Sequence, residues 1–243
     1  MNEASRKISL DYVIKQSFKY WKSTLFYQLV FTIVYFSTLT IFLIFLYQYF
    51  EIGSKIIEVK PLLESSNAET SANGYIELLS SSNVRNLVYF FSVVASALVY
   101  PLNIGFFKIY SLIDEQKPIS LNYLFEGYLG NNFFKFLSYY LIWGTVFYLL
   151  KMSIFPFAFL WVAFTIFVAP LLFFTPMNLI EAMKISFKVV AGNFFVIAAC
   201  SILAIIFSYS GFFLFFFGLL FTFPFWNAII YTLFKSYFRI KFV

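Results

Sequence analysis

Long intervals without a charged residue alternate with short charged segments along this chain. The first uncharged interval lies between Lys22 and Glu51, and the second lies between Arg85 and Lys108. An apolar run of about twenty residues is long enough to cross the hydrocarbon core of a bilayer as a helix. These intervals, and others of similar length toward the C-terminus, therefore predict membrane-spanning helices.

Dividing the whole chain in this way predicts six spans. The last uncharged interval, 189–234, is too long for one helix and fits two helices with a turn near Ser210 and Gly211. The predicted spans lie at approximately 25–50, 86–107, 131–150, 154–176, 190–209 and 212–234. We therefore expect an all-α polytopic membrane protein in which residues 1–243 form a single six-helix transmembrane domain.

The segments that precede each pair of spans are similar to one another. The motif Lys-x-Ser-Phe-Lys occurs at 15–19 and again at 184–188, each time with a leucine five residues before it. A third segment begins with Ile-Ser-Leu at 119–121, as the first does at 8–10. Read as helices, these segments have one apolar face and one polar face. The sequence therefore predicts three repeats, each an amphipathic elbow helix (within 10–21, 121–128 and 179–190) followed by a helical hairpin.

Two placements of the elbow helices agree with this pattern. They can lie in the headgroup layer with the apolar side toward the lipid. They can also be the cytoplasmic ends of long spanning helices that pack on one another. The sequence leaves both placements open.

The basic residues predict the orientation of the chain. Lys and Arg near the ends of spans concentrate on the cytoplasmic side of a membrane. When the N-terminus is placed inside, most of the 17 basic residues fall on the inner side. The sequence therefore predicts a multi-pass protein whose N- and C-termini are both cytoplasmic.

Basic residues on the elbow helices are candidates for binding lipid or a partner protein. A lysine close to an anionic membrane surface contributes about 1 kcal/mol of attraction. The alternative is that these lysines only determine orientation. Nucleic acid is not an expected partner, because the basic residues are spread over separate segments next to the membrane. The candidate residues are Lys15, Lys19, Lys22, Lys184 and Lys188.

Composition supports lipid as the solvent and argues against an enzyme. The chain is 62% hydrophobic and 12% charged, whereas soluble domains carry about 25% charged residues. It has no histidine and one cysteine, Cys200. The absence of histidine excludes Ser-His-Asp and Cys-His catalysis, and a single cysteine excludes a multi-cysteine metal cluster. We therefore expect neither catalysis nor a cofactor.

Two asparagines stand out among the polar residues of the predicted spans. Asn103 follows Pro101 closely, and Asn227 follows Pro224. A proline leaves a helix carbonyl without its donor, and a nearby amide can bind to that carbonyl. Asn103 and Asn227 therefore either stabilise helix kinks or line a polar pathway. The predicted spans contain no Asp or Glu, and the missing carboxylate argues against a proton-coupled transporter.

Two stretches carry a resemblance to a known family. The first is 101–130, PLNIGFFKIYSLIDEQKPISLNYLFEGYLG, and the second is 179–231, where an elbow ending Ala-Gly-Asn leads into a hairpin that closes on Thr-Phe-Pro. In these stretches the chain resembles bacterial six-span membrane proteins related to the membrane domain of some glycerophosphodiester phosphodiesterases. The resemblance implies a lipid-associated or accessory role in the bacterial inner membrane, and it supplies no catalytic residues.

These observations lead to one expected function and one alternative. The expected function is that of a non-enzymatic inner-membrane component that binds membrane lipids, or a membrane protein partner, through its elbow helices. The alternative is a transporter or lipid-translocating pore without proton coupling. In that case Asn103 and Asn227 would converge on a continuous pathway.

Overall fold

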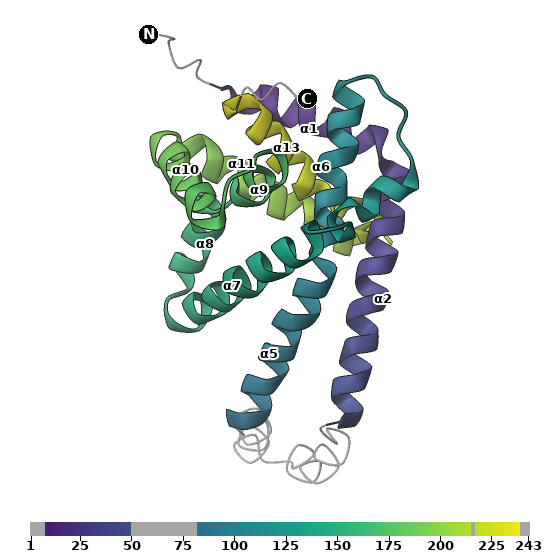
Figure 1. Cartoon of the computed structure of the whole chain (residues 1–243), viewed down its shortest axis with the longest axis vertical. Helices are drawn as coiled ribbons and strands as arrows, with labels where there is room; N and C mark the ends of the chain where they lie inside the picture. The colour runs from purple at the N-terminus through teal and green to yellow at the C-terminus, as the bar shows by residue number, and fades with distance from the viewer. Residues whose placement is uncertain (1–7, 50–81, 215–216, 239–243) are drawn as a thin grey trace. The chain divides into compact units, whose positions relative to one another are not determined.

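The computed structural model describes residues 8–49, 82–214 and 217–238, and all the regular secondary structure in them is helical (Figure 1). The predicted all-α class is therefore confirmed. The chain divides into two compact units, one formed by residues 1–34 and 100–243 and the other by residues 35–99.

The smaller unit contains the second part of α2 (Leu25–Tyr49) and all of α5 (Ser82–Val99). Its described side chains are mostly apolar and carry no charge, and many are exposed, including Ile41 at 67% and Phe90 at 62%. Exposed apolar surface of this extent is unusual on a soluble monomer and is typical of helices that face lipid.

The larger unit contains the remaining elements, in the order that their numbers give. They are α1 (Leu10–Ser23), α6 (Pro101–Asp114), η1 (Leu121–Tyr128), α7 (Asn132–Ser153), α8 (Phe155–Phe164), α9 (Val168–Phe174), α10 (Leu179–Gly192), α11 (Phe194–Ser210), η2 (Gly211–Leu214), α12 (Leu219–Thr222) and α13 (Phe225–Tyr237).

Five helical segments of the described chain are long and apolar enough to cross a membrane. They overlap the first five predicted spans, and the fifth begins later than expected because α10 continues to Gly192. The segments are Leu25–Tyr49, Tyr89–Asp114, Asn132–Ser153, Phe155–Phe174 and Phe194–Phe213.

The predicted sixth span, 212–234, is divided into short helices. It contains α12 and most of α13, and neither has the length of a complete span. Pro224 separates them because proline has no N–H to donate to the preceding turn. A chain reversal precedes α12, where a Cβ on Gly211 would collide with the backbone of Leu219.

The first and third elbows are helices of 14 residues, α1 and α10. Each begins after a capping side chain, Ser9 or Asn178, which accepts a hydrogen bond from a backbone N–H in the first turn. Each ends at a residue outside the helical conformation, Thr24 or Asn193, and the next helix starts at the following residue. These elbows are therefore separate helices and not continuous extensions of the spans.

The second elbow is the 3-10 helix η1, which packs closely against α6. A Cβ on Gly105 would collide with the carbonyl group of Leu124, and a Cβ on Gly127 would collide with that of Pro101. The two glycines therefore let the backbones of η1 and α6 touch.

The centre of the larger unit is formed by α6, α9 and α13, which contact one another. Tyr110 of α6 lies against Tyr231 of α13 with ring centroids 5.5 Å apart. Phe174 of α9 stacks on Phe234 of α13 at 5.4 Å. Each of these helices follows an interruption of the preceding helix, so each is the second part of an interrupted hairpin arm.

Each elbow packs on one of these interrupted arms. The elbow η1 packs on α6, and α10 packs on α8 and α9, in each case the arm that precedes the elbow in the chain. The elbow α1 instead packs on α13, the last helix (Figure 1). The first and last described helices are therefore neighbours.

Candidate functional site

The serine of the repeated motif docks both basic elbows. Ser17 and Ser186 are fully buried. The hydroxyl of Ser17 donates to Thr232 Oγ1 at 2.9 Å. The hydroxyl of Ser186 donates to the carbonyl oxygen of Phe164 at 2.6 Å and accepts from the backbone N–H of Phe167 at 3.3 Å. The second pair of contacts satisfies backbone groups at the break between α8 and α9.

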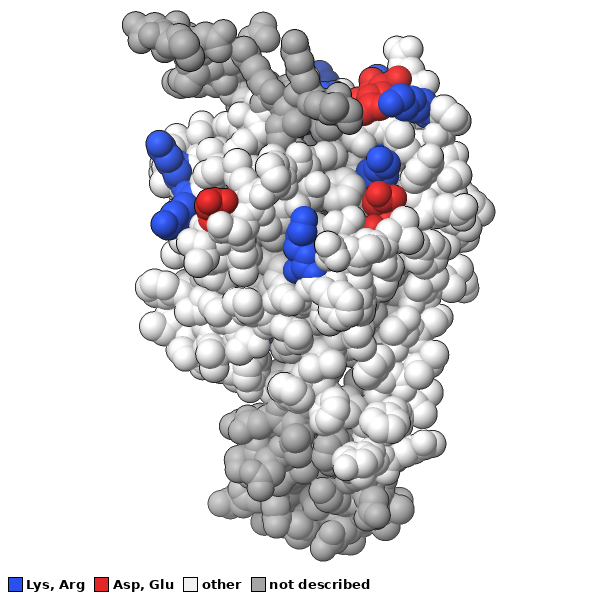
Figure 2. All heavy atoms as spheres, in the orientation of Figure 1, with Lys and Arg blue, Asp and Glu red and all other residues white. Residues whose placement is uncertain are grey.

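The candidate lysines lie on the outer faces of these elbows. All five, Lys15, Lys19, Lys22, Lys184 and Lys188, are exposed. In each motif the two lysines lie two residues before and two residues after the buried serine. Two residues along an α-helix correspond to a rotation of about 200°. Both lysines of a motif therefore point away from the packed face, and Figure 2 shows lysines on an otherwise largely uncharged surface.

The phenylalanine of the motif lies on the flank of each elbow. Phe18 is 36% exposed and Phe187 is 37% exposed. The ring of Phe18 packs against Phe207 of α11, with ring centroids 5.0 Å apart. The ring of Phe187 packs against Phe164 of α8 at 5.1 Å. In both elbows the phenylalanine therefore faces the helices of spanning length.

A second cluster of polar residues lies between α1, α6 and α13. Asp114, the last residue of α6, accepts hydrogen bonds from the hydroxyls of Tyr20 at 2.6 Å and Tyr231 at 2.8 Å. Its carboxylate also forms an ion pair with Lys235, at 2.7 Å. The Asp114 side chain is 14% exposed and that of Lys235 is 40% exposed. Three helices therefore meet at one carboxylate.

The hydroxyl of Tyr20 remains protonated in this cluster. Burial raises the pKa of Tyr20 above its usual value, and the hydrogen bond to Asp114 raises it further. Both effects favour the neutral phenol, which is the form that donates to a carboxylate.

A buried glutamine lies eight residues after Tyr20, in the first turn of α2. The Gln28 side chain is fully buried, and its Nε2 donates to Thr24 Oγ1 at 3.0 Å and lies 3.4 Å from the Tyr110 hydroxyl. Its Oε1 has no hydrogen-bond partner among the residues that the structure describes. A buried polar atom without a partner costs about 1–3 kcal/mol.

The structure brings Asn103 and Asn227 together. Nδ2 of Asn227 donates to Oδ1 of Asn103 at 3.0 Å, and Nδ2 of Asn103 donates to the carbonyl oxygen of Tyr100 at 3.0 Å. Asn103 therefore pairs with a carbonyl beside Pro101. Asn227 is fully buried, and its Oδ1 has no hydrogen-bond partner within the described chain.

Asp114 is not among the candidate residues that the sequence indicated. It is the last residue of α6, and its carboxylate points into the protein. One signal was available, because polar residues recur every four positions and so share one helix face. The recurring residues are Tyr20, Thr24 and Gln28 in the first segment, and Asn227, Tyr231 and Lys235 in the last.

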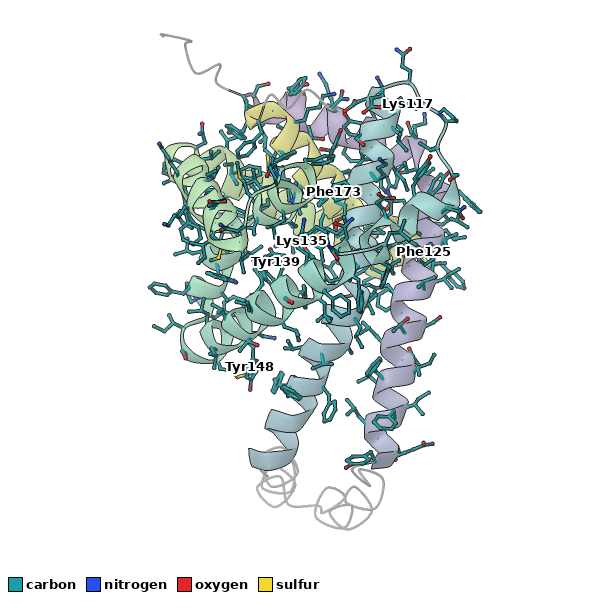
Figure 3. All side chains as sticks on the ribbon, in the orientation of Figure 1. Lys117, Phe125, Lys135, Tyr139, Tyr148 and Phe173 are labelled. Atoms are coloured by element: carbon teal, nitrogen blue, oxygen red, sulfur yellow. The ribbon has the colours of Figure 1, made fainter. Side chains whose placement is uncertain are left out.

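Other side chains bind carbonyl groups near the helix breaks. Nε1 of Trp21, on α1, donates to the carbonyl oxygen of Phe221 at 2.7 Å, close to the break before α13. Lys135, which Figure 3 labels on α7, donates to the carbonyl oxygen of Leu172 in α9 at 3.1 Å. These contacts serve to satisfy backbone groups that an interrupted helix leaves free.

An apolar pocket lies between α7, α8 and α10. Within it, Nε1 of Trp143 donates to Thr165 Oγ1 at 2.8 Å. The residues that line it are Tyr139 (labelled in Figure 3), Ile142, Trp143, Trp161, Thr165, Leu179 and Met183. In the described part of the chain, no three His, Cys, Asp or Glu side chains lie together as metal ligands would.

Comparisons with family models, with curated proteins and with solved structures find no match to this chain. Within the described residues, the geometry defines an all-helical arrangement with several segments of membrane-spanning length, two exposed basic elbows and a largely buried polar cluster at Asp114.

Proposed function

We propose that this chain is a six-span membrane protein with both termini on the cytoplasmic side. The cluster around Asp114 supports an even number of crossings. Tyr20 precedes the first span, Asp114 ends the second, and Lys235 lies near the end of α13, yet all three are in contact. An even number of crossings brings them to the same surface if α12 and α13 together form an interrupted sixth span.

The proposed architecture is three repeats, each an elbow followed by a hairpin whose second arm is interrupted. The matching lengths and caps of α1 and α10 support two of these repeats. The packing of every elbow on an interrupted arm supports the third. Within the larger unit, the contacts of the elbows form a closed cycle, with η1 on α6, α10 on α8 and α9, and α1 on α13, and we call this set of contacts the ring of elbows.

The proposed function of this ring is to bind anionic lipid headgroups at the cytoplasmic surface, without catalysis, as a component of the bacterial inner membrane. One observation carries the proposal: a buried serine fixes each basic elbow so that its lysines face outward. If these lysines served only to orient the chain, they would not need a fixed direction on a docked helix.

Extraction with native lipid in polymer discs tests this proposal. The variant carries Lys15→Gln, Lys19→Gln, Lys184→Gln and Lys188→Gln together. We expect anionic lipid to be enriched over bulk membrane in discs of the wild-type protein and not in discs of the variant, with equal insertion of both. Equal enrichment would contradict the proposal. A stoichiometric protein lost only from the variant would assign the surface to a protein partner instead.

A second function, a pathway for lipid or another neutral solute, is supported by the Asn103–Asn227 pair. Two buried amide oxygens, Asn227 Oδ1 and Gln28 Oε1, have no partner within the described residues of the larger unit. A polar pathway would use such groups. The test is transbilayer movement of a fluorescent phospholipid in reconstituted vesicles. Movement that Asn227→Leu abolishes would support the pathway, and movement equal to that of protein-free vesicles would contradict it.

A further inference from the structure

We propose that the chain carries two separate sites for the phosphate of an anionic glycerophospholipid. One site is formed by Lys15 and Lys19 on α1, and the other by Lys184 and Lys188 on α10. This inference rests on the proposed function and adds to it the ligand group, the number of sites and their location.

The direction and spacing of the lysines support a shared phosphate at each elbow. The serine between them is buried, so both lysines of a motif lie opposite the packed face. They are four residues apart, and residues at this spacing on a helix have Cβ atoms about 5–6 Å apart. Two flexible ammonium groups at that separation can converge on one phosphate and form charge-assisted hydrogen bonds with it.

The phenylalanine of the motif favours a lipid over free phosphate. Phe18 and Phe187 are each about one-third exposed and pack against helices of spanning length. The exposed part of each ring can contact the upper acyl chain of a lipid whose phosphate lies at the lysines. A free anion would gain nothing from this ring.

The second elbow, η1, lacks the features of a site. The chain has no Lys or Arg between Lys117 and Lys135. The elbow η1 instead carries a half-buried acidic residue, Glu126, and exposes apolar side chains such as Phe125, which Figure 3 labels. Three elbows therefore give two sites and not three.

A local ion pair makes the two sites unequal. Lys15 pairs with Asp11 at 2.9 Å on the exposed face of α1. In α10 the nearby acid, Glu181, hydrogen-bonds the backbone N–H of Asn178 in a capping box. Asp11 therefore competes with phosphate for Lys15, and Asp11→Asn should tighten the α1 site by about two- to five-fold, the range for an exposed ion pair.

Native mass spectrometry of the purified full chain can count these sites. The protein in micelles is titrated with phosphatidylglycerol, with phosphatidylcholine as the neutral lipid and inorganic phosphate as competitor. We expect two tightly bound phosphatidylglycerols on the wild-type protein. We expect one after Lys15→Gln with Lys19→Gln, one after Lys184→Gln with Lys188→Gln, and none after all four. A matched control, Lys117→Gln with Lys151→Gln, should retain two.

The remaining outcomes separate this inference from the proposed function. If either pair of substitutions removes both lipids, the elbows form one shared site, which overturns the inference and leaves lipid binding intact. If all four substitutions leave both lipids bound, the inference and the proposed function both fail. If inorganic phosphate displaces the lipid at equal concentration, the elbows are general anion surfaces, which overturns the lipid assignment.

Discussion

The hydroxyl of Ser17 donates a hydrogen bond to Thr232 Oγ1 across 2.9 Å, although the two residues are 215 positions apart. Both side chains are buried, and they belong to α1 and α13. The bond therefore joins the first described helix to the last. Ser186 docks α10 in the same way but uses backbone groups of the preceding arm.

Removing the Ser17–Thr232 bond should weaken the docking of α1. In a double-mutant cycle of Ser17→Ala and Thr232→Val, we expect a coupling energy of about 0.5–1.5 kcal/mol, the range for such bonds in membrane proteins. The measurement is equilibrium unfolding in mixed micelles of increasing SDS fraction. Ser23→Ala is the control, because its hydroxyl bonds within its own helix, to the carbonyl oxygen of Lys19, and it should change little. A coupling energy near zero would show that the bond does not dock α1.

The contact between α6 and η1 should not tolerate a side chain at Gly105. A Cβ there would collide with the Leu124 carbonyl group, so Gly105→Ala should lower the free energy of unfolding by about 1–3 kcal/mol. Gly192→Ala is the matched control, because a Cβ at that helix end would have no atom of another residue within 4 Å. The control should be neutral or slightly stabilising. Equal stability of the two variants would mean that the backbones are not in contact.

The carboxylate of Asp114 should matter more than the ammonium group that it pairs with. Asp114→Asn weakens two hydrogen bonds and an ion pair at a mostly buried position, so we expect a loss of about 1.5–3 kcal/mol in the free energy of unfolding. Lys235→Gln should cost under about 1 kcal/mol, because that side chain is 40% exposed. Lys117→Gln, which breaks the exposed pair with Glu115, serves as the surface control. The reverse order of effects would contradict the central role of the carboxylate.

Tyr20 should resist ionisation at alkaline pH. Its pKa in the folded chain is raised, first by burial and then by the Asp114 hydrogen bond. A raised pKa stabilises the fold below the unfolded pKa of about 10, and this contribution is lost as pH rises through the folded pKa. Near pH 10 the wild-type protein and Tyr20→Phe should therefore have the same tyrosinate absorbance. A smaller absorbance in the variant would mean that Tyr20 titrates normally.

The uncharged intervals predicted much of the helical framework. The predicted span 25–50 matches α2, Leu25–Tyr49, because lipid excludes charge from a spanning segment. The same signal could not reveal the division of 212–234 into short helices. That division follows from Pro224 and from the packing of α13, which is buried against α1, α6 and α11.

The candidate site was predicted in part. The lysines of both motifs are exposed as expected, and Asn103 does contact Asn227, although their roles remain predictions. The cluster at Asp114 was missed because its partners lie far away in the chain, at Tyr20 and Tyr231. Local sequence patterns do not reveal contacts between residues so far apart in the chain. These residues meet because α1 and α6 both pack on α13.

The sidedness of the two basic elbows is the most direct test of the proposed six crossings. Single cysteines replace Lys19 and Lys188, or are appended after Val243, in a Cys200→Ser background, and they are labelled with a membrane-impermeant thiol reagent. All three should react in inverted vesicles, whose cytoplasmic surface faces out, and none should react in right-side-out vesicles. Labelling of the two elbow cysteines from opposite sides, or of the C-terminal cysteine from the outside, would contradict six crossings. It would also contradict the placement of both lipid-binding elbows on the cytoplasmic surface.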